Sequence, residues 1–410
     1  MTKQPTYRFA GYTAPWVEKK LGEVSESFEY GLNASAKEFD GVNKYIRITD
    51  IDDFSNEFLK TNLTSPDVKI DESSDYLLSE GDILFARTGA STGKTYYYKK
   101  TDGVVFFAGF LIRARIKEDN DHIFIFQNTL TKDFKKYVDI TSQRSGQPGV
   151  NAKEYANFLF SLPSLPEQTA IGSCFQDIDQ LISLQQRKLE VLKEQKKTYL
   201  KLLFPAKGQT KPALRFAGFE DEWKEKYLYE VLKVSKDRNV DLAYDKNQVL
   251  SVSREAGVVN QIEYQGRSFA GADLSNYKIV NKENLIYTKS PLKGAPYGIF
   301  QISYTTGIVS PLYAVFKSTK QIFAPFVGLS LMDNNKASKY LSPIVTKGAK
   351  NTINITDEGS LQGKLLFPSI EEQRIIHTFF QDLDKAIAKQ EEKVNQLKES
   401  KQTLLRKMFI

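Results

Sequence analysis

The chain contains the same long segment twice, and this internal repeat limits the possible folds more than any other feature. The segment beginning LPSLPEQ at Leu162 and the segment beginning FPSIEEQ at Phe367 align without gaps over 43 positions, of which 19 are identical. A shorter duplication precedes each copy, YRFAGYTAPW from Tyr7 and LRFAGFEDEW from Leu214. The order of motif, variable region and long segment therefore occurs twice, which predicts two equivalent halves related by a pseudo-twofold axis.

Each long segment has the spacing of a helix that pairs with another helix. Its apolar residues recur in steps of four and three, which gives a narrow seam of two positions per heptad. Both helices are expected to begin with capping boxes, Ser164-x-x-Glu167 and Ser369-x-x-Glu372. A narrow seam favours pairing between the copies over the alternative, in which each helix packs only on its own globule. The expected seam residues are Phe175, Ile178, Ile182, Gln185, Leu189, Leu192, Phe380, Leu383, Ile387, Gln390, Val394 and Leu397.

Polar residues interrupt the seam at equivalent places in the two copies. Gln185 and Gln390 share one seam position, and Lys196 and Lys401 share another. Polar seam residues lower stability but can fix the register and the partner of a helix. The two copies are therefore expected to pair with each other, as a rod of about 58 Å if about 39 residues are helical at about 1.5 Å each.

The two variable regions share little identity but a similar order of patterns. In each, an apolar strand enters a loop rich in glycine, a further strand follows, and helical patterns precede a second polar loop. The expected strands are Gly81–Gly89, Val104–Ile116, Glu283–Gly298 and Gly307–Phe316, and the expected helical patterns are Phe126–Ile140 and Phe326–Leu341. This order predicts two mixed α/β globules.

The fold class that follows is α+β, with two mixed α/β domains separated by two long helices and an internal pseudo-twofold repeat. We expect four consecutive parts: a first globular domain at 1–161, a first spacer helix at 162–205, a second globular domain at 206–366 and a second spacer helix at 367–410.

Composition narrows the setting in which such a chain works. A single cysteine, Cys174, excludes an internal disulfide framework and suits a reducing compartment. No apolar run has the length of a signal peptide core or a membrane span, so we expect a cytoplasmic protein. The net charge of +7 lies mostly outside the two helical segments, which is compatible with a nucleic-acid partner.

The stretch ARTGASTGKT, Ala86–Thr95, resembles a phosphate-binding P-loop. A P-loop needs four residues between its first glycine and the Gly-Lys pair, but only three separate Gly89 from Gly93. Nucleotide binding through Gly93–Thr95 is therefore kept only as an alternative.

The chain offers few residues for catalysis or for a metal ion. Its two histidines, His122 and His377, are isolated, and no cysteine cluster accompanies them. It lacks the Asn-Pro-Pro-aromatic motif with which amino-methyltransferases hold a base, and no glycine-rich cofactor loop follows a strand. We therefore expect a non-catalytic protein that has no cofactor and no metal.

Taken together, these motifs resemble one family, the specificity (S) subunits of type I restriction-modification enzymes. The resemblance depends on the paired RFAGY…W and RFAGF…W motifs, on GDILFARTGASTGK, and on LPSLPEQTAIGSCFQDID with its second copy FPSIEEQRIIHTFFQDLD. It covers essentially the whole chain. It implies two target-recognition domains, an antiparallel coiled coil, and a non-catalytic role in DNA methylation and bacterial defence.

The resemblance also implies partners. These are double-stranded DNA, two DNA-methyltransferase (modification) subunits, and restriction subunits that translocate and cut DNA. The first domain would read one half of an asymmetric bipartite target and the second domain the other half. A coiled-coil adaptor that joins proteins without touching DNA is the other alternative.

The polar loops supply the candidate DNA contacts. Glycines permit close approach of the backbone to phosphates, and an arginine such as Arg87 can bond guanine O6 and N7 together. The candidates are Arg87, Thr88, Ser91, Lys94, Arg144, Ser145, Gln147, Asn151, Lys289, Ser290, Lys293, Tyr297, Lys347, Lys350 and Asn351.

Repeated carboxylates lie off the helical seam. Asp177 and Asp179 recur as Asp382 and Asp384. Residues two apart on a helix do not share a face, so a joint catalytic or metal role is unfavourable. We expect them instead to form a surface used twice, once for each modification subunit.

Overall fold

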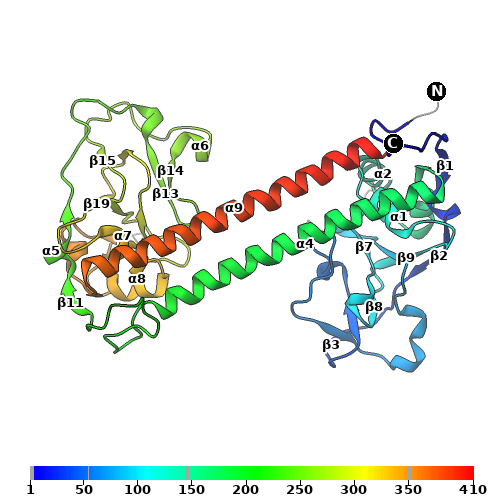
Figure 1. Cartoon of the computed structure of the whole chain (residues 1–410), viewed down its shortest axis with the longest axis horizontal. Coiled ribbons are helices and arrows are strands. Elements are labelled where there is room, and N and C mark those ends of the chain that lie inside the picture. The colour runs from blue at the N-terminus through cyan, green and yellow to red at the C-terminus, as the bar shows by residue number, and fades with distance from the viewer. Residues whose placement is uncertain (1–3, 54, 144–146, 349–352) are drawn as a thin grey trace. The chain divides into compact units, whose positions relative to one another are not determined.

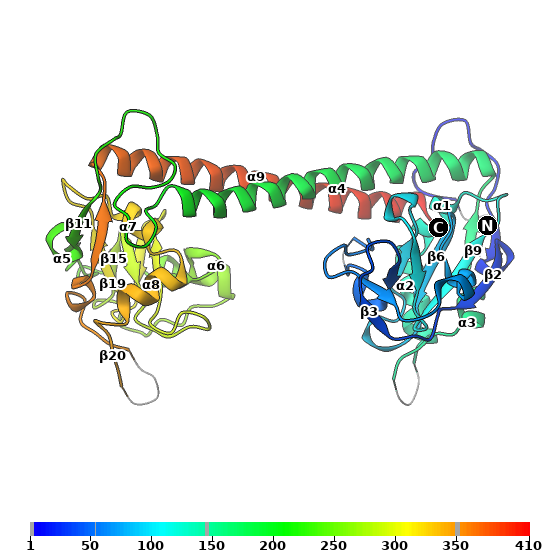
Figure 2. The same ribbon diagram turned by 90° about the horizontal axis from the view of Figure 1, so that it is seen from below.

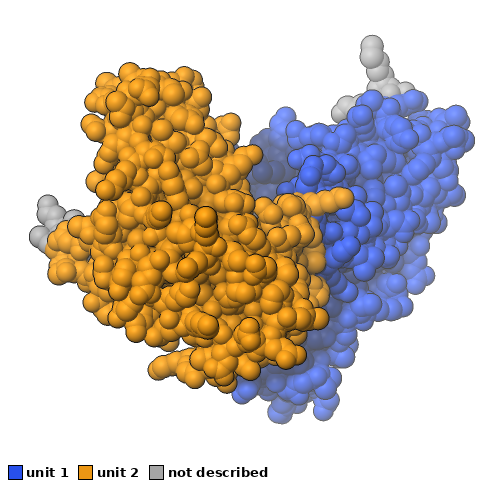
Figure 3. All heavy atoms as spheres, turned by 60° about the vertical axis from the view of Figure 1, so that its left-hand side comes forward, with its two compact units in different colours: residues 1–188, 390–410 blue, residues 189–389 orange. Residues whose placement is uncertain are grey.

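The computed structural model describes residues 4–53, 55–143, 147–348 and 353–410 (Figure 1). The chain divides into two compact units, coloured separately in Figure 3. Unit 1 comprises residues 1–188 and 390–410, and unit 2 comprises residues 189–389. Each unit contains part of the long helix α4 (Leu165–Leu202) and part of the long helix α9 (Ile370–Met408). The remainder of each unit is called here its head.

The first head is built on a four-stranded antiparallel sheet with the order β2-β9-β6-β7. Its central strand β6 reads DILFA, and all five residues are buried, because layers of side chains cover both faces of the sheet. The strands of this head are β1 (Val17–Lys20), β2 (Ser25–Tyr30), β3 (Ala36–Glu38), β4 (Lys44–Ile46), β5 (Thr64–Pro66), β6 (Asp82–Ala86), β7 (Thr95–Tyr97), β8 (Val105–Phe107), β9 (Leu111–Ile116) and β10 (Leu159–Leu162).

Both long helices contribute to the core of unit 1. Phe175 of α4 and Phe409, directly after α9, pack with ring centroids 5.6 Å apart, and Phe409 also stacks on Phe124. The first head supplies three further helices to this unit. They are α1 (His122–Asn128), α2 (Lys132–Thr141) and α3 (Ala152–Ala156).

The second head repeats this plan. Its main sheet has the order β12-β19-β16-β17, again antiparallel, and a short pair β11-β22 corresponds to β1-β10. The strands are β11 (Lys224–Tyr227), β12 (Lys233–Val234), β13 (Leu250–Ser253), β14 (Gly257–Asn260), β15 (Lys278–Val280), β16 (Leu285–Tyr287), β17 (Phe300–Ile302), β18 (Gly307–Val309), β19 (Ala314–Lys317), β20 (Thr346–Lys347), β21 (Ile353–Asn354) and β22 (Lys364–Phe367). The helices are α5 (Leu228–Val231), α6 (Gln261–Gln265), α7 (Ala324–Ser330) and α8 (Asn334–Leu341).

The observed elements are shorter than the expected ones. The expected strand Val104–Ile116 is two strands, β8 and β9, which belong to different sheets. The two helical patterns are also each two helices, α1 with α2 and α7 with α8. Capping side chains explain the breaks, because Thr131 caps α2 and Asp333 caps α8.

The α+β class, with two β-rich parts and two long helices packed together, agrees with the expectation. Within each unit the helices run in opposite directions (Figure 2). In unit 1, Asp179 pairs with Lys401 and Gln185 bonds to Gln390. No helix among the described residues is long and apolar enough to cross a membrane.

Candidate functional site

The duplicated RFAG motif supplies a buried ion pair that ties each head to the start of a long helix. Arg8 bonds Glu167 at 2.6 and 2.7 Å, and Arg215 bonds Glu372 at 2.8 and 2.7 Å. Both glutamates are about 1% exposed. The glutamate carboxylates therefore accept hydrogen bonds from the arginines. In the expected capping boxes they would instead have accepted from the backbone N–H of the serine at the start of each helix. In α9 half of the expected box remains, because the Ser369 hydroxyl accepts from the Glu372 amide.

The glutamine after each of these glutamates fastens the head to the helix in the same way twice. Gln168 accepts from the Asp121 amide at 3.0 Å and donates to the Pro163 carbonyl at 2.9 Å. Gln373 accepts from the Phe323 amide at 2.9 Å and donates to the Pro368 carbonyl at 3.0 Å. The repeated PEQ and EEQ letters thus encode a junction between head and helix.

The polar seam residues meet one another across the two long helices. Gln390 donates to the Gln185 side chain at 3.0 Å. Lys401 pairs with Asp179 at 2.7 Å, and Lys196 pairs with Asp384 at 2.5 Å. Each seam lysine therefore has a carboxylate of the other helix as its partner, which offsets the cost of a charge in the seam.

The apolar seam residues are buried to different extents. Phe175 and Phe380 belong to the cores of their units, Leu189 and Val394 are 4% and 2% exposed, and Gln390 is also buried. The remaining seam residues are half-buried, which is typical of a two-helix contact open to solvent. They are Ile178, Ile182, Gln185, Leu192, Leu383, Ile387 and Leu397.

The four carboxylates expected to bind partners have two different environments. Asp179 and Asp384 are engaged with seam lysines. Asp177 and Asp382 are exposed on the helix surface, and Asp382 pairs with Lys385 in a solvent-exposed contact. A role in partner binding stays a prediction, and the geometry favours the exposed pair for it.

In the first head the two polar loops lie against each other. Gly89 donates to the Pro148 carbonyl at 3.0 Å, and Val150 donates to the Arg87 carbonyl at 2.9 Å. Thr88 forms a β-bridge with Gly149, and Ser91 is the last residue of the short 3-10 helix Gly89–Ser91, which the Thr92 amide closes by donating to the Gly89 carbonyl. The loops after β6 and before α3 therefore form one surface.

Among the described residues of this surface, Arg87 is a cation with no carboxylate partner, whereas Lys94 pairs with Asp53. Its guanidinium lies 4.8 Å from the centre of the Tyr30 ring and donates weakly to the Gly109 carbonyl at 3.4 Å. No Asp or Glu among the described residues forms an ion pair with Arg87. The Tyr30 hydroxyl in turn accepts from the Ala152 amide at 3.3 Å, so the ring is fixed against α3.

Other candidates in the first head hold the loops in place. Lys94 pairs with Asp53, donates to the Ile51 carbonyl at 2.9 Å, and is only 12% exposed. Asn151 caps α3 by accepting from the Glu154 amide at 2.9 Å. Gln147 is exposed beside Gly89.

A tyrosine that was not among the candidates clamps the glycine loop. The buried Tyr155 hydroxyl donates to the Ala86 carbonyl at 2.7 Å and accepts from the Gly93 amide at 3.0 Å. Burial raises the pKa of Tyr155 beyond the physiological range, so this hydroxyl stays protonated and can donate.

The second head also brings its two loops together. The Lys347 ammonium lies 4.9 Å from the centre of the Tyr297 ring. Lys289, at the strand position that corresponds to Arg87, differs from it because it pairs with Asp357 at 2.6 Å. Ser290 and Lys293 are exposed on the loop that leads from Lys289 to Tyr297.

Asp357 joins two lysines at the base of this loop. It pairs with Lys278 at 2.5 Å and with Lys289 at 2.6 Å. Burial would raise the pKa of Asp357, but the hydrogen bonds from both lysines outweigh burial and hold the pKa below its usual value. Lys289 has a positive φ of 49°, a conformation that this anchoring helps to hold.

Four candidates, Arg144, Ser145, Lys350 and Asn351, lie outside the described residues. Sequence reasoning missed Tyr30, Asp53 and Asp357, which support the loops from distant elements. No local pattern marks them, because each contact joins segments far apart in the chain. No cluster of metal-ligating side chains occurs within the described ranges.

Known proteins with similar sequences and structures agree with these observations. Residues 14–194 match the model of the type I restriction modification DNA specificity domain. The type I restriction enzyme MjaVIII specificity subunit of Methanocaldococcus jannaschii is 24% identical over 378 residues, which cover 86% of this chain and 83% of that protein. The crystal structure of a type I restriction-modification S subunit from M. genitalium has the same fold, with a TM-score of 0.64, 12% identity, and coverage of 100% of this chain and 99% of that one.

Proposed function

Since the chain belongs to the specificity (S) subunits of type I restriction-modification systems, the non-catalytic DNA-recognition components, we propose that each head reads one half of an asymmetric DNA target. The geometry of Arg87 carries this proposal. A guanidinium that has no carboxylate partner in the described part of the chain and lies on an aromatic ring is oriented but not neutralised.

In this proposal Arg87 reads a base in the first half-site. A planar guanidinium can donate two hydrogen bonds to O6 and N7 of one guanine in the major groove. The loop amides and hydroxyls beside it, including Thr88 and Ser91, contact phosphates and set the orientation of the head. Lys94 holds the loop through Asp53 and Ile51.

The second head uses lysines in the corresponding place. Lys289 is tied to Asp357, and Lys347 lies on Tyr297. A lysine is a point charge and makes less directional contacts than an arginine. We therefore propose that Lys293 and Lys347 contact phosphates or single acceptor atoms of bases. Lys289 chiefly holds the conformation of the loop.

The paired helices have two roles in this account. Their length would set the spacer between the two half-sites. They also present Asp177 and Asp382 at equivalent positions for two modification subunits. Restriction subunits would join that assembly and cut unmodified DNA.

Expression of the chain together with the modification subunits of the same system tests this function. We expect adenine or cytosine methylation in one bipartite motif that disappears when the chain is omitted, mapped by single-molecule sequencing. Arg87→Ala should change or abolish one half of the motif only. A methylation motif that is independent of the chain would overturn the proposal.

A further inference from the structure

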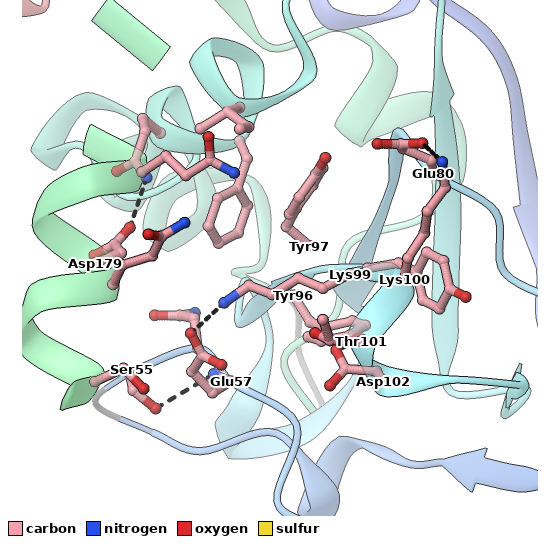
Figure 4. Close-up of a pocket in the computed structure, with 18 of the residues that line it drawn as sticks. Ser55, Glu57, Glu80, Tyr96, Tyr97, Lys99, Lys100, Thr101, Asp102 and Asp179 are labelled. Carbon is pink, nitrogen blue, oxygen red and sulfur yellow. Dashed lines mark hydrogen bonds and ion pairs between the residues drawn. The ribbon is translucent and has the colours of Figure 1, made fainter. Parts of the chain in front are cut away.

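The first unit contains a cavity of about 470 Å³ between its head and helix α4. Tyr97 and Phe126 form an aromatic wall with ring centroids 5.7 Å apart, and Leu184 of α4 also lines the cavity. Figure 4 shows the Tyr97 ring standing between the Glu80–Lys100 pair and the side of the cavity that carries Asp179. A volume of this size accommodates a few side chains of a bound partner.

The acidic side chains of the cavity are already neutralised by lysines of this chain. Glu57 pairs with Lys99, Glu80 with Lys100, and Asp102 with Lys60. Asp179 pairs with Lys401 of α9.

One cation of the cavity wall remains available. Arg187 of α4 is exposed, and no carboxylate of the described residues pairs with it. Arg187 is therefore the lining cation that has no carboxylate partner among the described residues, and it lies in the same cavity as the aromatic wall. An incoming carboxylate would complement Arg187.

Two further residues with polar groups, Gln127 and Tyr97, line the cavity. Gln127 is 1% exposed, its amide nitrogen donates to Asp179 at 3.0 Å, and its side-chain oxygen has no donor within the described part of the chain. Burial raises the pKa of Tyr97 to about 12, so its hydroxyl is protonated at physiological pH.

The second copy differs at the corresponding positions. The residue two positions after strand β17 is Tyr304, and its ring stacks on His377 of α9 with ring centroids 6.2 Å apart. The residue two positions after strand β7 is Lys99, which instead pairs with Glu57. On α9 the residues that match Leu184 and Arg187 are Lys389 and Glu392. The apolar and cationic lining is thus a property of the first copy.

From this difference we propose that the cavity is a socket for one modification subunit, which inserts a segment carrying an apolar side chain and a carboxylate. The apolar side chain packs on Tyr97, Phe126 and Leu184, and the carboxylate bonds to Arg187. The inference rests on the proposed assembly with two modification subunits. It adds that the two subunits are held unequally, more tightly at unit 1.

Native mass spectrometry of the full chain titrated with the purified modification subunit tests the socket. The variants Leu184→Lys and Arg187→Glu copy the residues of α9, and Ser183→Trp obstructs the cavity from α4. We expect each variant to bind the first modification subunit at least tenfold more weakly than wild type does. The reciprocal changes Lys389→Leu and Glu392→Arg on α9 serve as matched controls and should not weaken assembly.

The outcomes separate the socket from the proposed function. A wild-type chain that takes up no modification subunit contradicts both. A wild-type chain that takes up two, with the α4 variants equal to wild type in both binding steps, overturns the socket alone. Circular dichroism at increasing temperature confirms that each variant is folded, and because three different variants probe the cavity, loss of one does not remove the test.

Discussion

The two junctions between head and helix share a framework but differ at the point of closest approach. In unit 1 the α1 cap is Asp121, and α4 has Gly172 beside it, where an added Cβ would meet the Asp121 carboxylate at 2.2 Å. In unit 2 the residue that corresponds to Asp121 is Phe323, and α9 has His377 against its ring, with centroids 5.0 Å apart. The residue of the long helix that faces the cap is therefore glycine where the cap is Asp121, and a ring that packs on the cap where the cap is Phe323.

This difference shows which parts of the two junctions are the same in both copies and which parts differ. The Arg–Glu pair and the glutamine anchor are kept in both copies, because each satisfies buried polar groups whose loss is costly. At this junction the cap and the facing residue differ together between the two copies, while the framework around them is the same.

The largest expected effect comes from breaking the shared framework. Glu167→Ala leaves Arg8 without its carboxylate and also removes the acceptor of the Trp16 indole N–H at 3.3 Å. We expect a loss of about 3–5 kcal/mol in the free energy of unfolding, measured by urea denaturation. Glu372→Ala should cost somewhat less, because the Trp223 indole N–H has no acceptor within the described structure.

An exposed ion pair supplies the control for this experiment. Lys69 and Glu72 pair at 3.0 Å but are 80% and 71% exposed, so Glu72→Ala should change stability by less than about 1 kcal/mol. If Glu167→Ala were as mild as Glu72→Ala, the RFAG motif would not have the structural role assigned to it.

The framework also shows what the sequence could and could not reveal. The repeat and the helical seam follow from two gapless copies of 43 positions, and the order of strand and loop follows from patterns a few residues long. The two β-rich parts and the two packed long helices agree with these expectations. Glu167 looked like a capping residue because Ser-x-x-Glu is a local signature, yet its partner Arg8 lies 159 positions away. Asp179 looked like a surface residue because its partner Lys401 belongs to the other copy. Local patterns do not encode such distant partners.

The second prediction uses pH to separate the two junctions. Burial lowers the pKa of His377 to about 4, below the usual value near 6.5. The unfolded chain therefore binds a proton between pH 6.5 and pH 4 that the folded chain does not, so unit 2 should lose up to about 3 kcal/mol as the pH falls through this range. Above pH 6.5 the contribution of His377 is constant.

Hydrogen exchange in separate peptides measures this effect unit by unit. Protection of β16 should fall with acidification more than protection of β6, and His377→Phe should remove the excess. Equal acid sensitivity of the two strands in wild type and variant would show that His377 does not titrate as the structure indicates.

The third prediction concerns the glycine that faces Asp121. Gly172→Ala should displace the Asp121 carboxylate, which caps α1 through the Phe124 amide at 2.8 Å. The expected cost is about 1–3 kcal/mol. Ser173→Ala, at the exposed neighbouring position, should be nearly neutral, and equal melting temperatures for both variants would remove the steric explanation.

The smallest expected effect concerns the two strand-end cations. Arg87→Lys keeps the charge but loses the planar fork, so it should cost about 1–3 kcal/mol of discrimination at one guanine of the first half-site. Replacement of that guanine by 7-deazaguanine should lower the DNA affinity of the wild-type complex more than that of the variant complex. Lys289→Ala should alter only the second half-site, and altered recognition of both halves by either variant would contradict the division of labour.

The spacing of the two half-sites tests the whole account most directly. One heptad inserted beside Gln185 and one beside Gln390 keeps the seam in phase and adds about 10 Å to the paired helices. The account predicts that the methylated motif keeps both half-sites and gains about three base pairs of spacer, since base pairs rise by about 3.4 Å. An active complex with an unchanged spacer would contradict it.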